Sequence, residues 1–119
     1  MADQFEYSIS ECTSKEDTFI VTLSGDLIGE HVVPEFMEQI TNMIDSDRIK
    51  CIVKLSELKF INSSGIGILI TLLTKMRNRG GELVLVKPSE KLNKLLAMTK
   101  LLAIFKIAET EESAIELLY

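Results

Sequence analysis

Short apolar runs alternate with helix-length segments along this chain, and this alternation constrains the fold more than any other feature. The run 49-IKCIVKLS-56 is strongly apolar, and so is the shorter run 82-ELVLVK-87. The segment between them carries apolar residues at helical spacing and ends at Gly80 and Gly81, which favour the turn just past a helix. Buried strands joined by helices pair in parallel with right-handed crossovers. The alternation therefore predicts an α/β layer structure.

The first part of the chain predicts an antiparallel hairpin. Phe5, Tyr7 and Ile9 alternate with polar residues, which is typical of a half-buried strand. A polar turn over 13–17 separates them from the run 18-TFIVTLSG-25, which is rich in β-branched residues and ends at a glycine. The hairpin adds an antiparallel edge to the parallel sheet.

Four helices are predicted from start signals and from apolar residues that recur at helical spacing. Pro34 fits the first turn of a helix because its missing N–H would have no partner there in any case. The helices are expected to begin near Pro34, Ser64, Ser89 and Thr110, and a last short strand is expected over 104–108. The predicted fold is α/β, with a mixed and mostly parallel sheet, an N-terminal antiparallel hairpin and about four helices.

Length and charge limit what such a fold can do. The 119 residues are expected to form a single domain over 1–119, because a second core of useful size does not fit. The chain has 18 acidic and 13 basic residues, a formal net charge of −5, whereas nucleic-acid binding requires a concentrated basic face. We expect no nucleic-acid partner, and we expect Lys75, Arg77 and Arg79 to form a solvated helix end.

Targeting and membrane signals are not recognisable in the sequence. The N-terminal residues MADQFEYS are acidic and do not follow the basic-then-apolar order of a signal peptide. The longest apolar stretch, 66–73, is far shorter than the ~20 residues that cross a bilayer. A cytoplasmic protein without membrane insertion is expected.

The cysteines and the single histidine indicate packing rather than metal chemistry. Cys12 and Cys51 lie far apart and belong to no C-x-x-C pattern, and His31 is the one histidine. No cluster therefore has the spacing of metal ligands. We expect both thiols to be reduced packing residues, and we expect neither a metal nor a cofactor.

The stretch Asn62-Ser63-Ser64-Gly65 lies where a predicted strand leads into the second helix. Serine and asparagine favour helix N-caps because their side-chain oxygens accept hydrogen bonds from unpaired backbone N–H groups. Gly65 and Gly67 are expected to let the helix pack close to a neighbour. A helix cap is the simplest interpretation of the stretch, and a nucleophile or a phosphorylation site are the alternatives.

Serine catalysis needs residues that this chain does not supply. The nucleophile elbow G-x-S-x-G requires a glycine two residues before the serine, and Ile61 and Asn62 stand at those positions. The one candidate base, His31, is expected in the loop before the first helix, with no recognisable orienting partner. The dinucleotide fingerprint G-x-G-x-x-G fails at Ile70, and a P-loop Gly-Lys-Ser/Thr is missing. We therefore expect no catalytic residues.

A serine at a helix start is also suited to phosphorylation. Exposed N–H groups and the positive end of the helix dipole favour a phosphate there. Phosphorylation adds about −1.5 to −2 charges at neutral pH. Such a charge need not unfold the domain, and it can instead repel a partner that docks on the same surface.

Three stretches carry a resemblance to a known family: 23-LSGDL-27, 52-IVKLSELKFINSSGIGIL-69 and 80-GGELVLVKPSEKLNKLLAMTKL-101. In this order they resemble the STAS domain, particularly the stand-alone bacterial anti-sigma factor antagonists, whose signature between strand and helix is Asp-Ser-Ser/Thr-Gly-Leu-Gly. The resemblance covers nearly the whole chain, from about residue 5 to residue 118. A STAS domain over 1–119 is therefore expected.

The resemblance implies a switch between partners rather than a reaction. In the family, the unphosphorylated antagonist binds an anti-sigma factor that is a serine kinase, and the sigma factor is released. The kinase then phosphorylates the first serine of the signature, which ends the interaction, and a PP2C-type phosphatase restores it. By position, the phosphorylated residue is Ser63. The implied partner-binding residues are Asp26 and Leu27, in a loop after the second strand, together with Asn62, Ser63, Ser64, Gly65, Ile66 and Gly67.

Two positions depart from the family pattern. Asn62 stands where the family usually has Asp, and it keeps an acceptor oxygen but lacks the carboxylate. Lys100 stands where relatives often carry Gly after the third helix, which implies a helix end built without the usual glycine. Asn62 favours an alternative function, a STAS adaptor subunit of a transporter or another signalling complex in which Ser63 is not phosphorylated.

Ile68 and Leu72 lie beside the expected sheet-facing stripe of the second helix. Such residues either pack on a neighbouring helix or form an exposed apolar surface for a partner beside Ser63. The stripe itself is expected to comprise Ile66, Leu69, Ile70, Leu73 and Met76.

Overall fold

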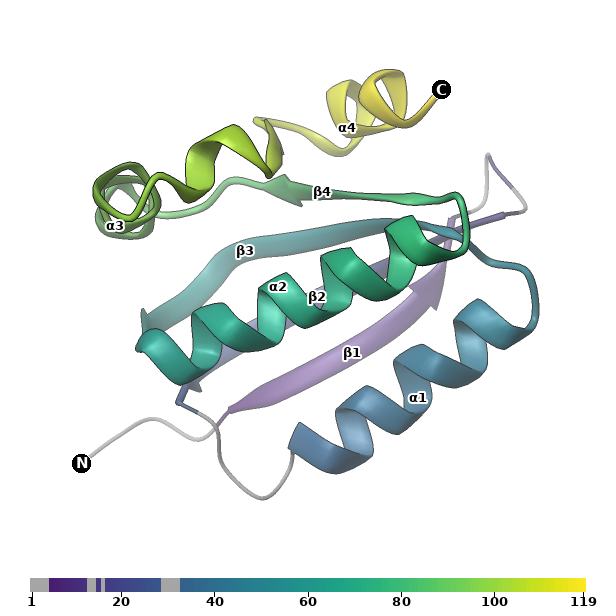
Figure 1. Cartoon of the computed structure of the whole chain (residues 1–119), viewed down its shortest axis with the longest axis horizontal. Coiled ribbons are helices and arrows are strands. Elements are labelled where there is room, and N and C mark those ends of the chain that lie inside the picture. Colours follow the sequence, from purple (N-terminus) through teal and green to yellow (C-terminus); the bar gives the residue numbers. More distant parts are fainter. Residues whose placement is uncertain (1–4, 13–14, 16, 29–32) are drawn as a thin grey trace.

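The computed structural model describes residues 5–12, 15, 17–28 and 33–119, and these form one five-stranded sheet in the order β1-β2-β3-β4-β5. β1 pairs antiparallel with β2, and the remaining neighbours pair in parallel, as Figure 1 shows for β1 to β4. The predicted hairpin and mixed sheet are thereby confirmed. The strands are β1 (Glu6–Glu11), β2 (Thr18–Leu27), β3 (Lys50–Ile61), β4 (Glu82–Val86) and β5 (Lys106–Ala108).

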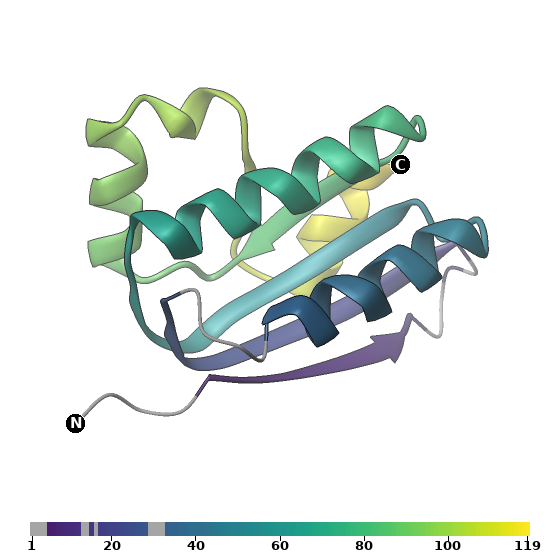
Figure 2. The ribbon, with the colours of Figure 1, turned by 60° about the horizontal axis from the view of Figure 1, so that its bottom comes forward.

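Helices cover both faces of the sheet. In Figure 2, α1 and α2 lie in front of the strands, whereas α4 lies behind them. The predicted helix starts near Pro34, Ser89 and Thr110 are confirmed to within one residue. The described residues contain α1 (Val33–Asp45), α2 (Ser63–Asn78), α3 (Glu90–Met98), α4 (Glu111–Leu118) and the 3₁₀ helix η1 (Leu101–Ala103).

Among the described residues, the buried hydrophobic side chains form two clusters, one on each face of the sheet. Successive residues of a strand point to opposite faces, so Val21 of β2 packs with α1 and α2 while Ile20 packs with α4. Cys51 belongs to the first cluster and Cys12 to the second, and both are buried and outside any disulfide. Burial raises the pKa of the Cys51 thiol far above its ordinary value, so this thiol stays protonated. The prediction of reduced packing cysteines is confirmed.

The apolar face of α2 is wider than the predicted stripe. Leu69, Leu73 and Met76 are buried as predicted, but Leu72 is only 1% exposed and belongs to the same core. Ile68 is half-buried against that core. Both residues that lie beside the predicted stripe therefore pack against the core, and Leu72 forms no exposed surface next to Ser63.

β2 and β3 both run further than the sequence predicts. The prediction ends them at Gly25 and Ser56, whereas the strands continue to Leu27 and Ile61. Gly25 has a φ of 77°, a left-handed conformation that glycine adopts without strain, and the chain resumes strand pairing after it. The extension carries both strands to the start of α2.

Bulges in β3 interrupt the alternation of apolar and polar residues by which a strand is recognised from sequence. Between Thr22 and Leu27, β2 advances five residues while the paired part of β3 advances seven, so β3 holds two extra residues. Each extra residue is a bulge, which changes the side chains that face the core. β3 accordingly presents Leu55 and then Leu58 to the core, three positions apart.

The segment after α3 contains tighter turns than predicted. Lys100 has a φ of 64°, which confirms a left-handed helix end without glycine. The 3₁₀ helix η1 follows, so β5 spans three residues instead of the predicted 104–108. Thr110 and Ser113 then form a capping box that starts α4.

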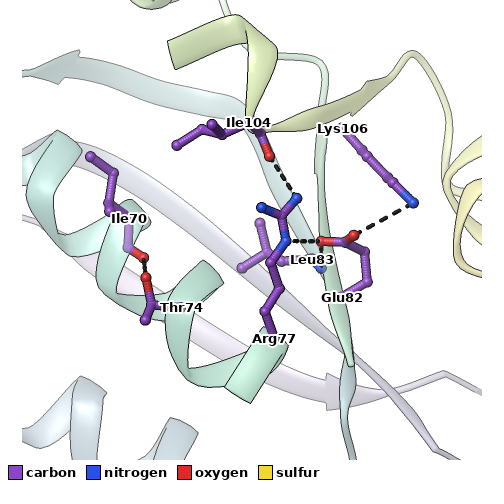
Figure 3. A network of polar contacts seen from close by, with 7 residues as sticks. All are labelled: Ile70, Thr74, Arg77, Glu82, Leu83, Ile104 and Lys106. Atoms are coloured by element: carbon purple, nitrogen blue, oxygen red, sulfur yellow. Dashed lines mark hydrogen bonds and ion pairs between the residues drawn. The ribbon is translucent and has the colours of Figure 1, made fainter. Parts of the chain in front are cut away.

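Arg77 near the end of α2 is exposed, as the sequence predicts, but it also makes contacts that the sequence does not reveal. Its Nε lies 3.1 Å from Oε1 of Glu82, and its Nη2 donates to the carbonyl oxygen of Ile104 at 2.7 Å (Figure 3). Arg79 also has a partner, since its Nη1 lies 3.2 Å from Oδ1 of Asp45 in α1. The end of α2 opposite Ser63 is therefore linked to β4, to the segment before β5 and to α1.

The free energy of unfolding is expected to fall in acid because Glu82 is more acidic in the folded protein. Partial burial favours its protonated form, but the Leu83 N–H, Arg77 and Lys106 outweigh burial and lower the pKa of the Glu82 carboxyl group. A carboxyl group with a lowered pKa stabilises the fold when the pH lies above the ordinary pKa of glutamate. This stabilisation is lost as the pH falls through the pKa of the group in the folded protein. Glu82→Gln should therefore weaken the pH dependence of the free energy of unfolding, measured in urea between about pH 3 and 5.

The matched control for that measurement is Glu116→Gln, which removes a carboxyl group from an exposed position of α4. It should leave the pH dependence close to that of the wild type. Equal weakening of the pH dependence by Glu82→Gln and Glu116→Gln would contradict a specific role for the Arg77–Glu82 contact.

Candidate functional site

The candidate site is the turn at which β3 leads into α2. Asn62 is the N-cap: its backbone is extended, with φ −111° and ψ −174°, and its Oδ1 accepts a hydrogen bond from the Gly65 N–H at 2.9 Å. Ser63 and Ser64 are the first two residues of the helix, and both are exposed. The stretch does contain the predicted helix cap, but Asn62 rather than a serine makes it.

Gly65 occupies a position with no room for a side chain. An added Cβ would lie 2.2 Å from the carbonyl oxygen of Leu27 and 2.6 Å from Cγ1 of Ile61. The Asn62 N–H donates to the same Leu27 oxygen at 3.4 Å. The predicted close packing is therefore confirmed at Gly65. It is wrong at Gly67, where an added Cβ would meet no heavy atom of the described residues within 4 Å.

Asp26 and Leu27 lie beside this turn, in the strand extension rather than in the predicted loop. Asp26 pairs with Phe60, and Leu27 pairs with Ile61, in the β2–β3 ladder. Asp26 is 9% exposed, and the side chain of Leu27 is fully buried. Leu27 therefore contacts the turn through its backbone carbonyl oxygen.

The predicted site residues come together, but they differ in what they present to solvent. Ser63 and Ser64 are exposed, and Asn62 and Gly67 are partly exposed. Ile66 is buried, so its side chain supports the helix start from inside. His31, the candidate base, lies outside the described residues. Contact of these residues with a partner stays a prediction.

Replacing Asn62 by alanine is expected to lower the free energy of unfolding by about 1 kcal/mol, because the Gly65 N–H loses its side-chain acceptor. Asn62→Asp keeps an acceptor oxygen and places a negative charge at the positive end of α2. It should be at least as stable as the wild type. Urea unfolding of the three proteins measures both effects, and equal destabilisation by the two variants would show that Asn62 does not act as a cap.

The part of the chain that the structure describes contains neither a group of metal ligands nor a membrane-spanning helix. Within it, no group of three or more His, Cys, Asp or Glu side chains is placed to hold a metal ion. None of its helices is long and apolar enough to cross a membrane. What the arrangement offers chemically is an exposed hydroxyl, Ser63, fixed at the start of a well-packed helix.

Sequence reasoning misses one feature beside this turn. Phe60 is 44% exposed, and the Lys91 Nζ from α3 lies 5.7 Å from the centre of its ring. The sequence suggests that Phe60 is simply part of a strand pattern. The sequence shows only that a large aromatic residue stands two positions before the cap. Because β3 contains bulges, the alternation of residues does not reveal whether the Phe60 side chain faces the core or solvent.

The mixed five-stranded sheet, the helices on both of its faces and the strand-to-helix turn define an α/β protein with the SpoIIAA-like fold. The model of the STAS domain family matches residues 10–114, and the chain belongs to this family. The resemblance stated from sequence is confirmed at the level of the family.

Individual relatives agree with this assignment. A Thermotoga maritima protein named as a candidate anti-sigma factor antagonist is 34% identical over 67 residues, which are 56% of this chain and 59% of that relative, less than two thirds of its length. A solved Thermotoga maritima structure, also named as a candidate anti-sigma factor antagonist, is 26% identical with a TM-score of 0.74, over 96% of this chain and 93% of that one. The Bacillus cell fate determinant SpoIIAA, solved in its phosphorylated form, is 24% identical with a TM-score of 0.70, over 98% of this chain and 100% of that one.

Proposed function

We propose that this protein is an anti-sigma factor antagonist that acts in the cytoplasm by switching partners. In its unphosphorylated form it binds an anti-sigma factor that is a serine kinase, and the sigma factor is released. The kinase phosphorylates Ser63 and so ends the interaction, and a PP2C-type phosphatase reverses the modification. The protein is a binder and a substrate, and it catalyses no reaction of its own.

The exposed Ser63 hydroxyl at the first position of α2 is the observation that carries this proposal. Asn62 makes the capping hydrogen bond, so the helix start does not depend on the Ser63 side chain. Backbone N–H groups of the first turn and the helix dipole favour a phosphate at this position. The fold is shared with SpoIIAA, a protein solved in a phosphorylated form, which shows that a protein of this fold can be phosphorylated.

The proposed partner surface combines exposed residues with buried ones that hold them in place. Ser63 and Ser64 face solvent, whereas Leu27 and Gly65 fix the helix start through the close contact of their backbones. The surface comprises Asp26, Leu27, Asn62, Ser63, Ser64, Gly65, Ile66 and Gly67.

The test uses the purified chain, Mg-ATP and the anti-sigma-type serine kinases of the organism that carries it. Intact-mass spectrometry should detect one added phosphate, and peptide mapping should assign it to Ser63. Ser63→Ala should abolish the phosphate and keep the complex with the kinase. Ser64→Ala is the matched control, because it removes the neighbouring exposed hydroxyl, and it should still be phosphorylated.

The alternative function has a specific observation in its favour, because Asn62 supplies a cap without the carboxylate that is usual in the family. In that case the chain is a STAS adaptor in a transporter or another signalling complex. A stable complex in which Ser63 gains no phosphate would overturn the switch and favour the adaptor.

A further inference from the structure

A small apolar groove opens next to the Ser63 turn, between the end of β3 and the start of α3. It has a cavity volume of about 40 Å³. α3 lies at the same end of the sheet as the start of α2 (Figures 1 and 2). We call it the β3–α3 groove, with Leu55, Leu58 and Leu92 as its buried floor and Lys59, Phe60 and Lys91 as its exposed rim.

The charge of this groove is opposite to that of the protein. The chain carries a formal net charge of −5, yet Lys59 and Lys91 are the charged residues among the described residues that line the groove. Glu90, next to Lys91, is turned to Lys94, with 3.7 Å between its Oε1 and the Lys94 Nζ. A positive rim on an acidic protein favours an acidic partner, because electrostatic complementarity selects partners and speeds their encounter.

The size of the groove decides which kind of ligand it fits. Small-molecule and cofactor sites occupy about 300–1,000 Å³, and this groove is several times smaller. It accommodates the tip of one apolar side chain on its leucine floor. Phe60 adds an exposed aromatic surface at the rim, and aromatic residues of this kind often carry much of the energy of an interface.

The groove is continuous with the Ser63 turn. Ile61 lines it and also lies against Gly65, where an added Cβ would be 2.6 Å from Ile61 Cγ1. A partner that reaches Ser63 therefore has the groove within the same contact surface.

We propose that the β3–α3 groove is a docking site for an acidic segment of a partner protein, which inserts one apolar side chain beside a carboxylate that meets Lys91. That the partner is the kinase acting on Ser63 rests on the proposed function above. The groove then holds the kinase at a point separate from the residue it modifies.

The first experiment tests the groove without the kinase. Two blocked synthetic peptides are added to the ¹⁵N-labelled chain, one with the sequence Asp-Glu-Leu-Phe-Glu-Asp and one in which lysine and arginine replace the acidic residues. The acidic peptide should shift the amide signals around Phe60 and Lys91 saturably. Lys91→Glu should weaken this binding about tenfold, and Phe60→Ala on the order of tenfold. High salt should weaken it too.

Lys100→Glu is the matched control, with the same charge reversal at an exposed position just after α3 and outside the groove. It should leave peptide binding close to that of the wild type. Equal binding of the basic peptide, shifts that map elsewhere, or no saturable shift at millimolar peptide would overturn the docking site. Concentration-dependent self-association that is lost with Phe60→Ala would also overturn it, because the occupant would then be a second copy of the chain.

The second experiment tests whether the kinase that phosphorylates Ser63 docks at the β3–α3 groove. With the kinase, Lys91→Glu should raise the KM for phosphorylation of Ser63 about tenfold and leave kcat nearly unchanged. An unchanged KM would remove the groove from kinase docking. If no kinase modifies Ser63 but the acidic peptide still binds, the proposed function fails while the docking site stands.

Discussion

Replacing Gly65 by alanine is expected to lower the free energy of unfolding by about 3 kcal/mol, the upper end of the usual cost of overpacking. The new Cβ would lie 2.2 Å from the carbonyl oxygen of Leu27, a distance that real Cβ atoms essentially never show. That oxygen belongs to the backbone of the β2–β3 ladder, so it cannot move aside as a flexible side chain would. The start of α2 must therefore shift, and Ser63 shifts with it.

Gly67→Ala is the matched control, two residues further along the same helix. An added Cβ has no described neighbour within 4 Å there, and alanine is the better helix former. The free energy of unfolding should rise by about 0.5–1 kcal/mol. Urea unfolding of both variants measures the difference. A Gly65→Ala protein as stable as the wild type would show that Leu27 does not hold the helix start.

The fold was largely predictable because its signals are local. Strand runs, helical periodicity, Pro34 and the glycines after α2 all act within a few residues of where they occur, and they yielded the mixed sheet. The strand extensions were not predictable, because two bulges in β3 break the alternation on which strand prediction depends. The contacts of Arg77 were not predictable for a similar reason, since its partner Glu82 and the Ile104 carbonyl come together only in the folded chain.

The candidate site was predicted less completely than the fold. A polar stretch between a strand and a helix located the turn correctly, and Asn62 kept the acceptor that the sequence suggested. The burial of Leu27 and the exposure of Phe60 depend on how β2 and β3 pair, and no single stretch of sequence reveals that pairing. The β3–α3 groove is likewise formed by segments about 30 residues apart, and it emerges only from the packing of α3 against β3.

Phosphorylation of Ser63 is expected to weaken binding to the kinase at least about 100-fold, which corresponds to about 2.7 kcal/mol, and to leave the fold intact. Within the chain, the added charge stands at the positive end of α2, where a negative group gains about 0.3–1 kcal/mol. At the interface the same charge must lose its water, which costs several kcal/mol unless the partner supplies a matching cation. Calorimetric titration of the kinase with the phosphorylated and unphosphorylated proteins measures the loss of binding. The melting temperatures of the two proteins show whether the fold stays intact.

Thr71→Glu separates a specific effect of Ser63 from a general effect of negative charge on α2. Thr71 is exposed and lies about two turns beyond Ser63 on the same helix, so its replacement adds charge away from the turn. Binding to the kinase should remain close to that of the wild type, whereas Ser63→Asp should weaken it in the same direction as the phosphate. Equal weakening by Thr71→Glu would assign the effect to the net charge of the protein. A phosphorylated protein that binds as tightly as before would remove the charge at Ser63 from the switch, because the surface around Asn62 would then tolerate it in the complex.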